Sequence, residues 1–209
     1  MKPKSQIDGR CTPTNLETIV SNATALIFDC DGTLVKTPEL YAKAWRKAFG
    51  KAGHSMDSIW YHQRAGMSEH VLMDEFATEF GAEFDREQVI ECLRQAVLEE
   101  IHTLTEITVV AAIARAQAGL KPMAVASGGP REIVLASLDA AGLTPLFDTV
   151  VTIDDVAAAK PAPDLFLEAA HRLGVPADGC LVLEDSPQGL LAAQNAGMAV
   201  VDVNDLSRW

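Results

Sequence analysis

Five short apolar runs recur along the chain and predict the strands of one sheet. They occupy residues 25–30, 122–127, 149–154, 180–185 and 198–203. Each run is almost continuously apolar instead of alternating with polar residues, which is typical of strands that are buried on both faces. We therefore expect a central sheet that is covered on both sides.

Segments with a helical pattern separate the later strands. They span residues 130–142, 163–174 and 186–197. Each ends at a glycine, and the first two begin at a proline, as helices commonly do. This alternation of strand and helix predicts an α/β fold with a parallel, Rossmann-like sheet and right-handed crossovers.

The segment between the first two strands breaks the alternation, because it contains helical patterns only. We expect its helices at residues 37–53, 68–81 and 85–104, with Thr37 and Asp85 as N-caps. The segment follows the first strand directly, at the edge of the sheet where α/β proteins bind ligands. An insertion at that point would lie over the site like a lid.

These patterns divide the chain into three parts. We expect a flexible lead-in at residues 1–21 that contains a helical turn near residues 16–20. The α/β core would comprise residues 22–37 and 107–209, and the inserted all-helical cap residues 38–106.

Composition excludes some classes of partner. The 209 residues carry a formal net charge of −12, whereas nucleic acid phosphates require a basic surface. An anionic substrate would therefore need local positive charge at its site. The N-terminus lacks an apolar signal core, and the apolar stretch at 108–120 is too short to cross a bilayer. We expect a cytoplasmic protein that binds neither nucleic acid nor membranes, and a monomer, because no long apolar stripe is left unassigned.

The four cysteines give no sign of a metal site or a disulfide framework. They are Cys11, Cys30, Cys92 and Cys180, without a C-x-x-C pair or a histidine cluster. Cys30 stands between two aspartates that follow the first strand, and alternation along the chain should point its side chain into the core. We expect all four to be reduced thiols.

Polar side chains with catalytic potential follow four of the predicted strands. They are Asp29 and Asp31 after the first strand, Ser127 after the second, Lys160 after the third, and Glu184 and Asp185 after the fourth. Because the carboxyl ends of parallel strands share one edge of a sheet, we expect these groups to converge. Two acids this close repel each other, which calls for a cation or for chemistry that uses them.

Four segments that carry these residues resemble the signature motifs of the haloacid dehalogenase superfamily of phosphohydrolases. The segments are DCDGT from Asp29, ASGG from Ala126, KPAPD from Lys160 and LEDSPQGLLAAQNAGM from Leu183. The helical insertion resembles that family's cap of the first type, and the chain is most similar to the beta-phosphoglucomutase-like branch of sugar phosphatases and mutases. The resemblance covers residues 25–203.

The resemblance implies a role for each aspartate. Asp29 would attack phosphorus and form an acyl phosphate, which splits a slow hydrolysis into two easier steps. Asp31 would protonate the leaving oxygen and then take a proton from water. Two adjacent acids can differ in this way when their environments push their pKa values apart.

The resemblance also implies a metal and a phosphate cradle. Mg²⁺ prefers oxygen ligands and bridges carboxylates to phosphate. We therefore assign as its ligands the carboxylates of Asp29 and Asp185 and the backbone carbonyl of Asp31. Glu184 would bind it directly or through an intervening group. Lys160 would neutralise both Asp29 and the transferred phosphoryl group. Ser127 and the amides of Gly128 and Gly129 would hold phosphate oxygens.

The cap departs from the mutase pattern that the resemblance implies. Tyr41 stands where mutases carry a histidine, Ala65 where they carry a lysine and Glu69 where they carry an arginine, although Arg64 is a neighbouring cation. Lys36 replaces a common acid in the linker. A mutase must hold a second phosphate, which Glu69 would repel.

A phosphatase for a small phosphorylated sugar or sugar acid is therefore favoured, with fructose 1-phosphate and 6-phosphogluconate as examples. A phosphosugar mutase and a non-catalytic protein that binds a phosphorylated ligand are the alternatives. A dehalogenase is disfavoured, because that reaction needs neither the second acid, Asp31, nor Mg²⁺.

Overall fold

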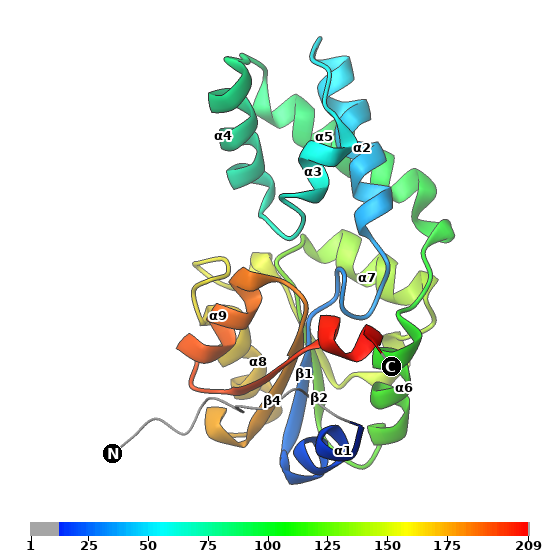
Figure 1. Ribbon diagram of the computed structural model, residues 1–209, viewed down its shortest axis with the longest axis vertical. Helices are drawn as coiled ribbons and strands as arrows, with labels where there is room; N and C mark the ends of the chain where they lie inside the picture. Colours follow the sequence, from blue (N-terminus) through cyan, green and yellow to red (C-terminus); the bar gives the residue numbers. More distant parts are fainter. Residues whose placement is uncertain (1–12, 209) are drawn as a thin grey trace.

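A five-stranded parallel sheet forms the centre of the computed structural model, which describes residues 13–208 (Figure 1). The strands are β1 (Ala25–Phe28), β2 (Met123–Ala126), β3 (Thr149–Val151), β4 (Cys180–Glu184) and β5 (Ala199–Asp202). Their order is β3-β2-β1-β4-β5, and Leu26 of β1 is in register with Met123 of β2 and Leu181 of β4. The expected α/β fold is confirmed, and each strand is somewhat shorter than its apolar run.

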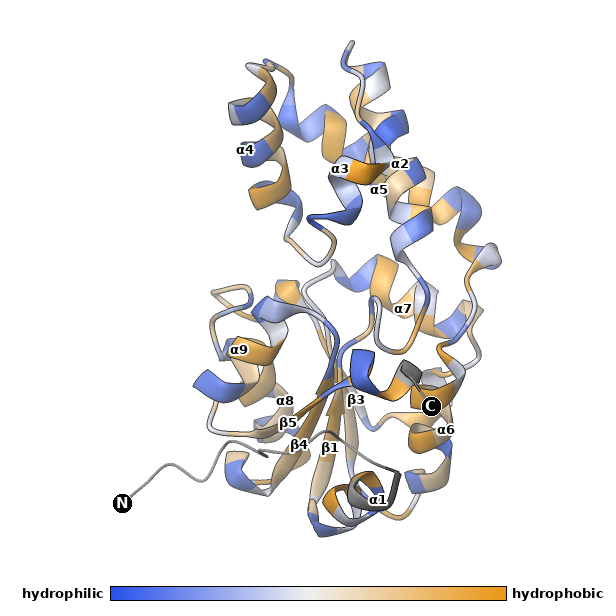
Figure 2. Cartoon of the chain, in the orientation of Figure 1, coloured by the Kyte–Doolittle hydropathy of each residue, from blue (hydrophilic) through white to orange (hydrophobic). Residues whose placement is uncertain are grey.

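Helices cover both faces of the sheet. They are α1 (Pro13–Asn22), α6 (Thr108–Gln117), α7 (Arg131–Ala140), α8 (Asp164–Leu173) and α9 (Pro187–Asn195). Leu26 and Phe28 belong to one buried cluster with residues of α6 and α7, whereas Ala25 and Ile27 belong to another with residues of α8 and α9. Figure 2 shows the resulting hydrophobic centre. Burial on both faces explains why the sequences of β1, β2 and β4 are continuously apolar, whereas the edge strands β3 and β5 are partly exposed.

Five short 3₁₀ helices complete the described part of the chain. They are η1 (Ile101–Thr103), η2 (Thr144–Leu146), η3 (Ile153–Asp155), η4 (Ala177–Gly179) and η5 (Val203–Arg208). Among the described residues, no helix has both the length and the apolar character needed to span a bilayer. Cys30 is fully buried in the core, as expected, and Cys11 lies outside the described residues.

Four helices stand together beyond the carboxyl ends of the strands (Figure 1). They are α2 (Pro38–Lys51), α3 (Ser58–His62), α4 (Glu69–Phe80) and α5 (Arg86–Glu100). Their interior is aromatic, since Phe49 stacks on Phe76 with ring centroids 3.9 Å apart and on Trp45 at 5.3 Å. This aromatic core lets the inserted helices pack with one another.

The two segments that join these helices to the sheet run side by side. The N–H of Lys36 donates to the carbonyl of Thr105 at 2.9 Å, and the N–H of Ile107 donates to Leu34 at 2.8 Å. Both connections therefore leave the core at one place. We propose this pair of segments as the boundary between the core and a cap of residues 38–106.

Three helices differ from the sequence-based expectation. The lead-in, expected to be flexible with one helical turn, forms α1 from Pro13 onward, and residues 1–12 lie outside the described part of the chain. The short α3 and the helix α6 were not anticipated. The sequence of α6, TVVAAIARAQ, was interpreted only as an apolar stretch too short to cross a bilayer. In the structure it is a helix whose Val110, Ala111 and Ala114 form a buried stripe.

Candidate active site

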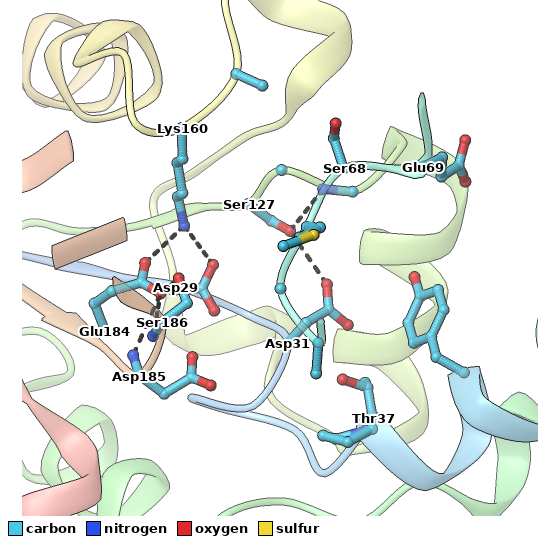
Figure 3. Close-up of a pocket in the computed structure, with 18 of the residues that line it drawn as sticks. Asp29, Asp31, Thr37, Ser68, Glu69, Ser127, Lys160, Glu184, Asp185 and Ser186 are labelled. Atoms are coloured by element: carbon cyan, nitrogen blue, oxygen red, sulfur yellow. Dashed lines mark hydrogen bonds and ion pairs between the residues drawn. The ribbon is translucent and has the colours of Figure 1, made fainter. Parts of the chain in front are cut away.

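The six polar residues that follow the strands meet in one cavity at the carboxyl edge of the sheet (Figure 3). The N–H of Asp29 still pairs with the carbonyl of Leu183 at 3.0 Å, and that of Ser127 pairs with Val151 at 3.0 Å. The sheet thus fixes the backbone that carries these side chains. Gly128 and Gly129 line the same cavity.

Lys160 joins two of the acids. Its Nζ lies 2.6 Å from Asp29 Oδ1 and 2.7 Å from Glu184 Oε2. All three side chains are almost completely buried. Burial alone would lower the pKa of Lys160, but the charges of Asp29 and Glu184 outweigh burial and raise it. The side chain is therefore a fixed ammonium beside Asp29.

Glu184 also holds the first turn of α9. Its Oε1 accepts hydrogen bonds from the N–H of Ser186 at 3.0 Å and from Ser186 Oγ at 2.8 Å. Gly189 passes so close that a Cβ there would collide with the Glu184 carboxylate. Both carboxylate oxygens of Glu184 are thus engaged, one by the helix and one by Lys160.

Three carboxylates form a cluster suited to a hard cation. Asp29, Glu184 and Asp185 each offer an oxygen, and these oxygens lie within 4.8 Å of one another. Burial and the charge of Glu184 raise the pKa of Asp29 well above its usual range and that of Asp185 to about 6. This surplus of negative charge is what a divalent cation would neutralise.

Asp185 is positioned by residues whose roles the sequence did not reveal. Thr33 Oγ1 donates to Asp185 Oδ1 at 2.9 Å. Gly32, with φ of +82°, lies against the same carboxylate, and a Cβ there would collide with it. Gly32 and Thr33 both belong to the DCDGT segment. Their position directly after Asp31 was the only sequence feature that could have pointed to a role in the site. Their place opposite Asp185 depends on a strand 150 residues later and could not be predicted locally.

Asp31 faces the cavity from the side opposite the carboxylate cluster. Its Oδ2 accepts a long hydrogen bond from Ser127 Oγ at 3.4 Å. Its Oδ1 is buried and has no hydrogen-bond partner among the described residues. Burial raises the pKa of Asp31. A carboxyl group with a raised pKa and a free oxygen at a cavity can serve as a proton donor.

The cap supplies the other wall of the cavity. Tyr41, Tyr61 and residues 65–69 line it, and Gly66 approaches Ser186 of the core so closely that a Cβ would lie 3.1 Å from that side chain's Cβ. Tyr61 belongs to the unanticipated helix α3 and was missed for that reason. Glu69 lines the cavity as a carboxylate, in keeping with its departure from the mutase pattern.

The cations Arg64, in the cap, and Lys36, in the segment that leads to it, do not line the cavity. Arg64 is bound by Glu75 at 2.7 Å and by Glu79 at 2.9 Å, and its guanidinium lies over the ring of Trp60. Lys36 is exposed. Neither side chain lines the cavity, so neither supplies charge for a second phosphate there.

A second network of charges fixes the turn after β3, which lies beside the loop of Gly128 and Gly129. Asp155 in η3 accepts hydrogen bonds from Arg172 Nη2 at 2.9 Å and from the guanidinium of Arg131. The N–H of Arg131 donates to Asp154 at 2.8 Å. Arg131 follows Gly129 by two residues, so this network ties the turn after β3 to the loop that would hold phosphate.

Asp155→Asn should lower the free energy of unfolding at pH 7 by about 1 to 2 kcal/mol, a modest loss because the pair is partly solvated. Burial would raise the pKa of Asp155, but hydrogen bonds from Arg172 and Thr152 outweigh it and lower the pKa from 3.8 to about 2. A lowered pKa stabilises the fold above about pH 4, and this stabilisation is lost as the pH falls towards 2. Urea unfolding should therefore show a difference that shrinks at pH 3, and a constant difference would contradict the assignment.

Comparison with known proteins identifies relatives over most of the chain. A family model described as haloacid dehalogenase-like hydrolase matches residues 23–197. The chain is 37% identical over 183 residues to the fructose-1-phosphate phosphatase YqaB of Escherichia coli, with 85% of this chain and 95% of that protein covered. It is 32% identical to protein CbbY of Rhodobacter capsulatus, with 85% and 83% covered.

Solved structures show the same fold. A hydrolase from Pseudomonas syringae superposes with a TM-score of 0.76 at 28% identity, with 88% of this chain and 90% of that chain covered. The α/β fold with a parallel five-stranded sheet is therefore shared with a solved hydrolase over most of both chains.

Proposed function

Because the chain belongs to the haloacid dehalogenase-like hydrolase family, we propose that it releases phosphate from a small phosphorylated sugar or sugar acid through an aspartyl phosphate on Asp29. Its similarity to named phosphatases makes it a phosphoric monoester hydrolase. The observation that carries the proposal is the setting of Asp29. This carboxylate lies at the base of the cavity beside the ammonium of Lys160, with Asp31 and Ser127 across from it. The similarity to a fructose-1-phosphate phosphatase supports a sugar phosphate as substrate.

The reaction would proceed in two steps. In the first, the Asp29 carboxylate forms a bond to phosphorus while the bond to the sugar oxygen breaks, and Asp31 gives its proton to that oxygen. In the second, water attacks the phosphorus of the aspartyl phosphate and Asp31 takes a proton from it. Inorganic phosphate leaves and the Asp29 carboxylate is restored.

The remaining residues of the cavity would stabilise the transferred group. Lys160 neutralises charge on Asp29 and on the phosphoryl oxygens. Ser127 and the backbone amide of Gly128 would donate hydrogen bonds to those oxygens. The amide of Gly129 donates to Ser127 Oγ at 3.1 Å in this structure, so it would reach the phosphate only after leaving that hydroxyl. A Cβ at Gly129 would lie 3.1 Å from Val134 Cγ2, which is tighter than ordinary packing, and in ordinary contact with Ser127 Oγ and Asp31 Oδ2.

The cluster of Asp29, Glu184 and Asp185 fits Mg²⁺, since its oxygens converge and carry excess negative charge. We propose the carboxylates of Asp29 and Asp185 and the backbone carbonyl of Asp31 as ligands. Glu184 would act mainly by holding Lys160 and α9, because both of its oxygens accept hydrogen bonds. When bound, Mg²⁺ would supply positive charge that offsets the charges of these carboxylates and of the phosphate.

Chelation with EDTA should reduce phosphate release by at least about 100-fold, and excess Mg²⁺ should restore it. The measurement is phosphate release from fructose 1-phosphate, 6-phosphogluconate, phosphoglycolate and a nucleoside monophosphate. Release that is strongest for a sugar or sugar-acid phosphate would support the proposal. Release that persists in EDTA would contradict the role of Mg²⁺.

The same assay distinguishes the alternatives. Conversion of a hexose 1-phosphate to the 6-phosphate, faster than phosphate release, would replace the proposal with a mutase. Binding of sugar phosphates without turnover, by folded protein that binds Mg²⁺, would indicate a non-catalytic protein. No observation in the cavity favours the mutase, since the residues that could hold a second phosphate are a carboxylate and neutral groups.

A further inference from the structure

The cap side of the cavity carries a carboxylate whose cationic partner lies outside it. Glu69 begins α4 and lines the cavity, with only 16% of its side chain exposed. Arg94 of α5 donates to both of its oxygens, from Nε at 3.2 Å and from Nη2 at 2.7 Å. Arg94 lines a separate surface groove together with His70. A molecule in the cavity would thus meet Glu69, whereas Arg94 does not line the cavity.

The charges around the cavity are unevenly placed. Among the described residues that line it, Lys160 is the only cation, and Asp29 and Glu184 already hold it. Figure 3 shows Glu69 on the opposite side of Asp31 from Lys160. The end of a substrate remote from the transferred phosphate would therefore face Glu69 and neutral cap groups.

The hydrogen-bonding properties of Glu69 determine which chemical groups of a substrate can bind beside it. A carboxylate accepts hydrogen bonds from hydroxyl groups but has no proton to give a phosphate, and it repels the phosphate's charge. The two-pronged contact with Arg94 fixes the orientation of the Glu69 side chain. The Glu69 side chain can thus bind the hydroxyl groups of a polyol and disfavour a second phosphate. Both effects would favour the same class of substrate.

We propose that the Glu69–Arg94 pair selects sugar monophosphates over bisphosphates. Glu69 receives the hydroxyl groups of the sugar, and Arg94 acts on the substrate only by positioning Glu69. The inference rests on the proposed phosphatase function and adds the class of substrate. Its test uses binding, so that it does not depend on turnover.

The test compares fructose 1-phosphate with fructose 1,6-bisphosphate, which differ only by the second phosphate. Calorimetric titration into the Asp29→Asn protein, in which neither sugar should be consumed, should show tighter binding of the monophosphate by at least about 10-fold. Adding Glu69→Gln keeps the size of the side chain and removes its charge, and should bring the two affinities within about 2-fold. Adding Glu69→Asp keeps the charge and should retain the preference.

Glu75→Gln is the matched control. Glu75 lies on the same helix and is also paired with an arginine, Arg64, but does not line the cavity. It should leave the preference unchanged. Equal affinity of the parent for both sugars, or the same preference after Glu69→Gln, would overturn the inference. Phosphate release by the protein with Asp29 intact reports separately on the proposed function.

Discussion

Asparagine in place of Asp29 should lower kcat for every phosphate monoester by about 10⁴-fold or more, because it removes the oxygen that would bond to phosphorus. Folding should survive the change. The amide has nearly the shape of the carboxylate, and Lys160 keeps its second partner, Glu184, at 2.7 Å. Since burial and the charge of Glu184 raise the pKa of Asp29, removing its charge should leave the melting temperature unchanged or higher.

The measurement is phosphate release at saturating substrate, accompanied by thermal unfolding of both proteins. Acid-quenched mass spectrometry should find a phosphorylated protein for the parent and none for the variant. Asp139→Asn, an exposed aspartate on α7, is the matched control and should behave as the parent. A variant at position 29 that keeps more than a few per cent of the parent's kcat would show that another group attacks phosphorus.

The central strands β1, β2 and β4 could be predicted from sequence because they are buried on both faces, whereas the edge strands β3 and β5 are only partly buried. Strands that are buried on both faces leave a continuous apolar run, as in Ala25–Phe28, and the run stops where the backbone leaves the core. The end of β3 could not be read in this way. Its run continues through Ile153 and Asp154, but Thr152 and Asp155 form a capping box that starts the turn η3. Contacts between side chain and backbone there override the apolar pattern.

The chemistry on the core side of the cavity follows from topology. Once the strands are parallel and in order, Asp29 and Ser127 must emerge at one edge. Lys160 lies in the loop that follows β3 and η3, so its exact place depends on how that loop folds. The cap side does not follow, because its residues come from separate helices whose packing depends on side-chain shape. Glu69 and Arg94 are 25 residues apart on α4 and α5, and their pairing becomes visible only when the cap is folded.

Replacing Asp31 with asparagine should reduce turnover of a sugar phosphate by about 10² to 10⁴-fold, and the first step with p-nitrophenyl phosphate much less. A sugar alkoxide needs a proton as it leaves, whereas p-nitrophenolate is stable without one. Asp31, which lines the cavity and whose pKa burial raises, is the group that we propose gives that proton. The contrast between the two leaving groups therefore isolates proton donation from other losses.

The second step should also slow, because the asparagine cannot take a proton from water. With p-nitrophenyl phosphate, the aspartyl phosphate should then accumulate, and rapid mixing should detect a burst of p-nitrophenolate close to the enzyme concentration. Ser127→Ala is the matched comparison, because Ser127 contacts Asp31 but would hold the phosphoryl group, so both substrates should lose rate by similar factors. Equal losses in the Asp31 variant, without a burst, would mean that Asp31 holds the phosphate and does not transfer the proton.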